Sequence, residues 1–320
     1  MAITIESTAA DLNNVQREYN QAINQIMRQG MQLEDEFTPR ATDRRYVAPN
    51  VSTTDVVQPY QWQFTPTGSA NFDQVALDLQ PIKIDILITE GDLEKFYDSW
   101  AVEWFESGRD AMEWSFPRYL YDQVYLPKIV EEMDRNAWKG VYAAPNAGTP
   151  GLSIASVDGY EKKFKDARDA GDLTEYATGA LVEGTMVNQV ETWIDSLPIP
   201  YRDAQGTIYC SPTNVKKYFR NYRSNFGYGA GVDNNPNNEL RVEMTNKQLK
   251  PLNALEGSDV MFFFPANTQN VIYVTRRGYP TLPSINWERH ERSIKGMATI
   301  YRAYGVEFWS HLFINDQLPV

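Results

Sequence analysis

The side chains that most often carry nucleophilic or metal chemistry are scarce in this sequence. His290 and His311 are the only two histidines, and Cys210 is the only cysteine. Neither histidine has the spacing of a metal motif such as HExxH, and one cysteine can neither close a disulfide within the chain nor supply several thiolate ligands. We therefore expect no metal site, no cofactor and no catalytic residue. A lone cysteine also fits folding in a reducing cytoplasm.

Carboxylate pairs are the next candidates for chemistry, because two of them can hydrolyse a glycosidic bond. Glu103 with Glu106, and Glu131 with Asp134, are such pairs. Each pair lies on the polar face of a predicted helix, where a solvated surface is the commoner explanation. The 8 Trp and 19 Tyr could form a sugar platform, but most of them have core spacing. We expect a protein that is not an enzyme, with a carbohydrate-active enzyme as one alternative.

A glycine-rich stretch at residues 226–231 invites comparison with a dinucleotide-binding loop. It follows a predicted helix and not a strand, and Asn-rich sequence stands where a helix should begin. The sequence also contains no GxxxxGK[ST] phosphate loop and no GxSxG nucleophile elbow. These absences weigh against the nucleotide-binding and hydrolase classes.

The composition limits the partners that this chain can have. Of its 320 residues, 42% are hydrophobic, and the formal net charge is -12. An acidic chain does not grip phosphate backbones over a broad surface, since that attraction comes from clustered Lys and Arg. No stretch approaches the roughly 20 apolar residues that span a bilayer, and no basic start precedes an apolar run. We therefore expect a folded protein without a membrane partner.

The N-terminal region divides into a helix and a polar segment. Apolar residues at steps of three and four predict an amphipathic helix that begins near Thr8 and ends at Gly30. Residues 34–58 are polar, contain two prolines and show no periodicity. This pattern predicts an extended arm that cannot form a core by itself and is held in place only by assembly contacts.

A hairpin is predicted after the arm. Tyr60, Trp62 and Phe64 alternate with polar residues, residues 66–71 have turn composition, and alternation resumes at Val75. The pattern indicates a long two-stranded ribbon with a bulky tip. Because a two-stranded ribbon is marginal in water, we expect it to pack on something else, such as another chain.

Helices dominate the next part of the chain. Thr89 precedes an apolar helical pattern, with Asp92 three positions later as in a capping box. Pro117 opens a second helical stretch, Pro127 kinks or restarts it, and Gly140 ends it.

The remainder predicts an alternating arrangement of helices and strands after a linker rich in Ala, Pro and Gly. The expected elements are a helix over 182–197, a strand over 207–210, a helix that opens at Ser211 and Pro212, strands over 260–264 and 271–275, and a last strand over 297–314 with a bulge at Gly305.

The order of these parts resembles the Hong Kong 97-type fold of tailed-bacteriophage major capsid proteins. The stretch IVEEMDRNAWKG (129–140), leading to GTPGL (148–152), is similar to the end of that family's spine helix and its turn into the axial domain. GTIYCSPT (206–213) is similar to a strand, turn and helix of the axial domain, and residues 271–313 resemble the closing strands.

The resemblance implies an α+β fold with five parts. These are an N-terminal arm (1–58), an extended hairpin loop (59–90), a peripheral domain with the spine helix (91–150), an axial domain (151–258) and return strands that complete both domains (259–320).

The resemblance also implies a function. The expected protein is a major capsid protein that self-assembles through hexamers and pentamers into the icosahedral shell of a tailed phage. It would enclose double-stranded DNA without sequence-specific binding, in the virion capsid, after folding in the cytoplasm of the bacterial host. A separate scaffolding protein, a portal and possible cement proteins are the implied partners. An encapsulin-like protein compartment is the second alternative.

Two groups of residues are expected at contacts between subunits. Trp62, Phe64, Asn71 and Phe72 belong to the predicted hairpin, where exposed aromatic residues would form an apolar patch that monomers avoid. Arg276 and Arg277 begin a basic segment: residues 276–302 hold six basic and two acidic residues, whereas residues 85–134 hold thirteen acidic and four basic ones. The opposite charges meet either between subunits or within one.

Overall fold

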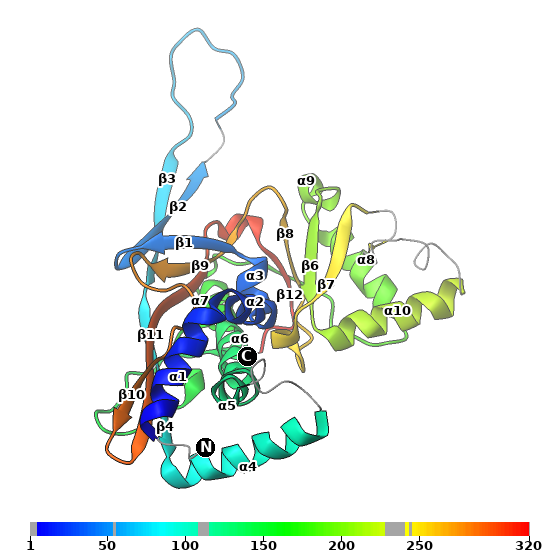
Figure 1. Cartoon of the computed structure of the whole chain (residues 1–320). Coiled ribbons are helices and arrows are strands. Elements are labelled where there is room, and N and C mark those ends of the chain that lie inside the picture. Colours follow the sequence, from blue (N-terminus) through cyan, green and yellow to red (C-terminus); the bar gives the residue numbers. More distant parts are fainter. Residues whose placement is uncertain (1–4, 54–55, 108–114, 228–240, 243–244, 320) are drawn as a thin grey trace.

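The computed structural model describes residues 5–53, 56–107, 115–227, 241–242 and 245–319. Its strands form two five-stranded sheets and a two-stranded ribbon, and its helices cover both sheets (Figure 1). The strands of the first sheet are β1 (Thr38–Thr42), β4 (Gln80–Thr89), β9 (Val271–Arg276), β10 (Asn286–His290) and β11 (Ser293–Val306). Those of the second are β5 (Glu175–Tyr176), β6 (Gly206–Cys210), β7 (Lys247–Pro251), β8 (Phe262–Pro265) and β12 (Phe313–Asn315).

The first sheet is built around the long strand β11. Its first part pairs with β10 and β4 on its two sides, and its last five residues pair with β9. The bulge predicted at Gly305 is wrong, because the register with β9 continues without interruption to Val306. Glycine is needed there for close packing instead: a Cβ at Gly305 would lie 2.6 Å from Cδ1 of Leu77 in the ribbon.

The ribbon consists of β2 (Arg45–Thr53) and β3 (Ala70–Asp78), which pair antiparallel. The prediction of a strand at residues 60–64 with a turn at 66–71 is wrong: residues 60–64 lie in the loop, and β2 comes from the segment predicted to be an arm. Tyr46 and Ala48 point to one face, against Leu77 and Val75, and this alternation favours the strand.

The N-terminal segment packs on the rest of the chain. It forms α1 (Ile5–Glu18), α2 (Asn20–Gly30) and α3 (Gln32–Glu36), so the single helix predicted up to Gly30 is two helices that meet at Tyr19. β1 then pairs parallel with β9. The expectation that only assembly contacts hold residues 34–58 in place is wrong, because this region buries Phe37 and Ala48 and its strand β1 joins the first sheet.

The helices after β4 follow the predicted order. α4 (Glu90–Ser107) is capped as expected, since the Asp92 N–H donates to Oγ1 of Thr89 at 3.3 Å. α5 (Phe116–Tyr119) runs through a π-helical segment (Leu120–Tyr125) into α6 (Leu126–Lys139). Gly140 ends α6, and its carbonyl accepts the N–H of Gly159 at 2.8 Å.

The second sheet has a core on each face. Successive residues of its strands alternate between the two sides: Ile208 and Phe263 face α8 (Met186–Ser196) and α10 (Pro212–Phe226), whereas Tyr209 and Phe262 face α7 (Tyr160–Ala170) and α6. Ser211 caps α10, whose Asn214 N–H donates to the Ser211 hydroxyl at 3.2 Å. Burial on both faces explains why these strands are rich in aromatic and β-branched residues.

Candidate assembly surfaces

In the part of the chain that the structure describes, the histidines and the cysteine are not grouped into a site. Cys210 is fully buried, and desolvation raises the pKa of its thiol to about 12, so a nucleophilic thiolate is disfavoured. His311 packs against the rings of Tyr201 and Phe308, while His290 is exposed on β10. Within the described residues, no three His, Cys, Asp or Glu side chains are placed to hold a metal ion, and no helix is long and apolar enough to cross a membrane.

The predicted carboxylate pair on α6 is also split. Glu131 is exposed, whereas Asp134 is buried and accepts the N–H of Leu33 at 3.1 Å, so it ties α6 to α3. Burial, together with the nearby Glu34 carboxylate, raises the pKa of Asp134 from 3.8 to about 6, although the N–H groups of Leu33 and Gln32 oppose the shift. The side chains of Glu103 and Glu106 lie outside the described residues.

Among the side chains that the structure describes, the most exposed apolar ones belong to the distal loop, residues 56–69, which stands away from the rest of the chain (Figure 1). Trp62 is 95% exposed and Phe64 is 89% exposed, and Val57 and Tyr60 are exposed to a similar degree. Polar contacts hold the loop internally: Nε2 of Gln58 donates to the Thr65 carbonyl at 2.6 Å. Its aromatic side chains therefore point outward from a loop with internal hydrogen bonds.

The other two residues of the predicted hairpin contact lie in the ribbon and not in the distal loop. Asn71 and Phe72 belong to β3, where their backbones pair with Ser52 and Val51. Their side chains are outside the described residues. The ribbon, rather than a turn centred on Asn71, thus carries the distal loop.

The two predicted arginines differ in how exposed they are. The Arg276 guanidinium lies over the rings of Tyr279 and Tyr301, at 4.5 and 4.6 Å from their centroids, so it is engaged within its own chain. Arg277 is exposed, and its N–H donates to the Thr42 carbonyl at 2.8 Å. Both lie at the end of β9, away from the distal loop, so the predicted contact residues form two separate surfaces (Figure 1).

One basic residue of the 276–302 segment is not at the surface at all. Arg302 is fully buried and donates to both Glu34 carboxylate oxygens, at 2.7 and 3.1 Å, and the Tyr304 hydroxyl donates to Glu34 at 2.8 Å. Burial lowers the pKa of Arg302, but Glu34 outweighs burial and the pKa is raised overall. Charge counting could not find this pair, because its partners are far apart in the sequence.

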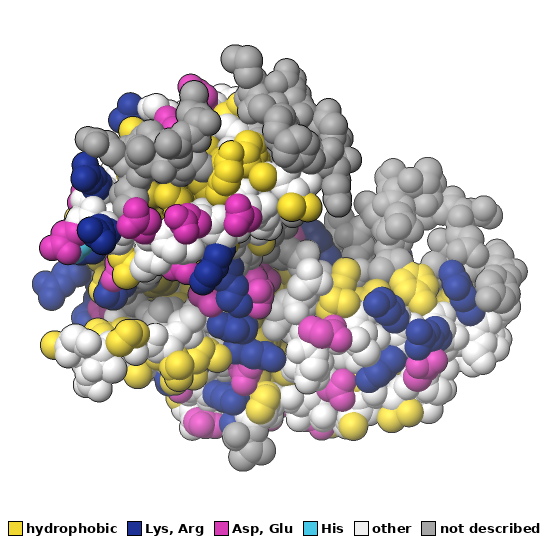
Figure 2. All heavy atoms as spheres, turned by 60° about the horizontal axis from the view of Figure 1, so that its bottom comes forward, with side chains coloured by type: hydrophobic (Ala, Val, Ile, Leu, Met, Phe, Trp, Pro, Cys, Tyr) yellow, Lys and Arg dark blue, Asp and Glu magenta, His cyan; other side chains and the backbone are white. Residues whose placement is uncertain are grey.

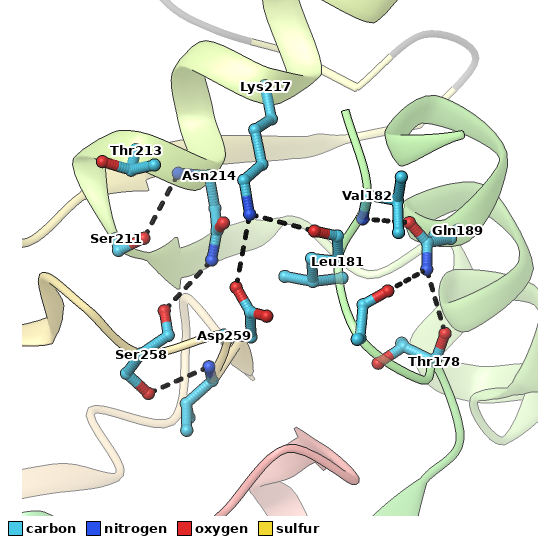
Figure 3. Close-up of polar contacts among 12 residues, drawn as sticks. Thr178, Leu181, Val182, Gln189, Ser211, Thr213, Asn214, Lys217, Ser258 and Asp259 are labelled. Atoms are coloured by element: carbon cyan, nitrogen blue, oxygen red, sulfur yellow. Dashed lines mark hydrogen bonds and ion pairs between the residues drawn. The ribbon is translucent and has the colours of Figure 1, made fainter. Parts of the chain in front are cut away.

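A polar framework fixes the helices of the second sheet (Figure 3). Nζ of Lys217 on α10 donates to the Leu181 carbonyl at 2.9 Å and lies 3.5 Å from Asp259, and the Asn214 amide donates to the Ser258 carbonyl at 3.1 Å. On α8, Gln189 donates to the carbonyls of Thr178 and Ala180 and accepts the N–H of Val182. These contacts turn Lys217 inward and hold α10 in a fixed orientation.

The comparisons with known proteins concern the fold. No family model and no curated protein matches this sequence. The structure resembles a chain of the satellite phage P4 procapsid including size determination (Sid) protein, with a TM-score of 0.58, 11% identity and coverage of 93% of this chain and 90% of that one.

Two further structures are similar. The capsid of the empty GTA particle gives a TM-score of 0.51 with 10% identity, covering 89% of this chain and 87% of that one. The capsid of cyanophage A-1(L) gives 0.50 with 10% identity, covering 90% and 91%. At such identities the likeness is one of fold, and it extends over nearly the whole chain. The predicted α+β fold of the Hong Kong 97 type is confirmed.

Proposed function

We propose that this chain is the major capsid protein of a tailed phage, the subunit that self-assembles into the icosahedral shell around a double-stranded DNA genome. The observation that carries the proposal is the capsid fold, which is shared over about nine-tenths of the chain with the three particles compared above. The arrangement of the candidate chemical groups supports a structural role without catalysis.

The distal loop supports assembly in particular. Trp62 and Phe64 are exposed to solvent on a loop that no other part of the described chain covers. Exposed aromatic residues that lie close together usually mark an interaction surface. In a shell, the loop and the ribbon residues Asn71 and Phe72 contact a neighbouring copy. The end of β9, with Arg276 and Arg277, forms a second contact between copies.

The remaining parts are assigned in the same proposal. The second sheet with α8 and α10 is the axial domain, α6 is the spine helix, and the first sheet belongs to the peripheral domain. The subunits form hexamers and pentamers in the host cytoplasm with the help of a separate scaffolding protein, and a portal and cement proteins are the further partners. The DNA is enclosed without base-specific contacts, in line with a net charge of -12.

Negative-stain microscopy of the expressed protein, combined with a sizing column, tests the proposal. Shells, tubes or ring-shaped capsomers are the expected result, whether the protein is expressed alone or with its genomic neighbours. A monodisperse monomer under all conditions would contradict it and favour the carbohydrate-active alternative. Particles that hold protein cargo and no nuclease-protected DNA would instead indicate an encapsulin-like compartment.

A further inference from the structure

Two helices of the chain carry stripes of opposite charge on their exposed faces. On α4, Glu90, Glu94 and Asp98 are exposed at steps of four, while Leu93 and Trp100 are buried on the other face. Within the described part of the chain, none of these three carboxylates forms an ion pair. Figure 2 shows acidic side chains in a row along this helix.

The opposite stripe lies on α10. Lys216, Arg220 and Arg223 are exposed at steps of four and three, and the 15 residues of α10 include no acidic one. Lys217 is turned inward, and the pair between Arg220 and Glu183 is exposed on both sides, so it is weak and exchangeable. Figure 2 shows basic side chains over α10, on the opposite side of this face from the acidic row.

The stripes also match in length and in their apolar ends. Each continues toward the C-terminus of its helix into an exposed apolar residue, Val102 at 58% on α4 and Phe226 at 54% on α10. With a rise of 1.5 Å per residue, the stripe on α4 spans about 18 Å and the stripe on α10 about 15 Å. A parallel alignment therefore places three carboxylates opposite three cations and Val102 opposite Phe226, whereas an antiparallel one places each apolar residue opposite a charge.

We infer that α4 of one copy packs parallel to α10 of the next copy around a capsomer. The inference rests on the proposed function, because it needs copies to meet head to tail, and such rings require two different but complementary patches on each subunit. The basic partner of the acidic helix is then α10 rather than residues 276–302, where Arg302 is buried and Glu288 and Glu291 lie among the exposed cations. Attraction between the stripes steers copies into register.

Charge reversal tests the contact. E90K/E94K/D98K and K216E/R220E/R223E should each slow assembly at least tenfold at low salt, measured by light scattering, because like charges then face each other. Combining both sets restores the opposite pairing and should return the rate to within about threefold of wild type. The control D169K/D172K/E288K changes the net charge as much as the α4 variant does, at exposed positions elsewhere, and should assemble normally.

A disulfide tests the alignment directly. Mixing V102C chains with F226C chains should give a covalent dimer in assembled particles under mild oxidation. Either variant alone should not, and the native Cys210 is too buried to interfere.

Three results would overturn the inference and leave the proposed function intact. They are the absence of a cross-link in assembled particles, the absence of rescue when both charge reversals are combined, and equal slowing of assembly in the control variant. If basic-stripe reversal impaired only DNA retention, α10 would face the genome instead. If wild type formed no particles, the proposed function would fail first.

Discussion

The side-chain amide of Asn13 pairs with both backbone groups of Trp287. Its Nδ2 donates to the Trp287 carbonyl at 2.8 Å, and the Trp287 N–H donates to its Oδ1 at 3.1 Å. Trp287 lies in β10, the edge strand of the first sheet, so α1 covers backbone groups that could otherwise pair with another chain.

Replacing Asn13 with alanine should loosen α1 from the sheet. Two neutral hydrogen bonds are lost, each with a net value of about 0.5–1.5 kcal/mol, so the free energy of unfolding should fall by about 1–3 kcal/mol. Urea unfolding of the unassembled protein measures this. Asn14→Ala, at the exposed neighbouring position, is the matched control. Equal midpoints for the two variants would show that the amide pairing adds nothing.

The buried Glu34 and Arg302 pair should be far more sensitive than surface pairs. Glu34→Gln leaves the Arg302 guanidinium buried without its carboxylate, which costs about 3–5 kcal/mol in unfolding free energy. Adding Arg302→Met should recover much of this loss, because the uncompensated charge is gone. As a control, Arg45→Met removes a pair that is exposed on both sides and should hardly move the midpoint. If the losses in unfolding free energy of Glu34→Gln and Arg302→Met simply added in the double variant, the two side chains would not be coupled.

Asp134 should make stability depend on pH. Its pKa is about 6 in the folded chain and 3.8 for an unperturbed group, so the folded state binds more protons between these values. Its contribution to stability is therefore full below about pH 4 and is lost as the pH rises through 6. Asp134→Asn should remove this loss. Relative to wild type, its free energy of unfolding should therefore increase by at most ~3 kcal/mol between pH 4 and pH 7.

The measurement compares urea midpoints of wild type and Asp134→Asn at several pH values. Glu131→Gln, on the exposed face of the same helix, should give a difference from wild type that varies little with pH. A constant difference for Asp134→Asn across the range would mean that the carboxyl titrates normally in the folded chain.

Serine at positions 62 and 64 should separate folding from assembly. Trp62 and Phe64 bury almost no surface in the isolated chain, so W62S/F64S should fold with an unchanged midpoint. The same variant should fail to close stable shells, because the apolar contact with a neighbour is lost. Circular dichroism measures the unfolding midpoint, and microscopy shows whether shells form. Normal shells from this variant would disprove the role of the loop as a contact between copies.

Local signals predicted the helices well. The Thr89 cap, the restart near Pro127 and the end at Gly140 each depend on residues within a few positions, and the structure has them all. The ribbon was harder. Pro49 argues against a strand, yet β2 belongs to a two-stranded ribbon in which each strand has a free edge that tolerates proline. The alternation of Trp62 and Phe64 predicts a strand, but it marks a loop with outward aromatic residues.

Long-range partners could not be predicted from local patterns. Nothing near Glu34 indicates that it neutralises Arg302, or that Asp134 binds the backbone of α3. For the same reason, counting charges placed Arg302 in an exposed basic segment. Of the predicted contact residues, Trp62, Phe64 and Arg277 are exposed, Arg276 is held by two tyrosines, and the contacts themselves stay predictions.

The parallel pairing of β1 with β9, which joins Thr38 to Ile272, has a consequence for biosynthesis. A ribosome adds about 5–20 residues per second, so tens of seconds pass before both strands and β11 have been made. During that interval β1 has no β9 to pair with, and α1 has no β10 to cover. Nascent chains are thus prone to aggregate, and subunits become competent to join a growing particle only once translation is nearly complete.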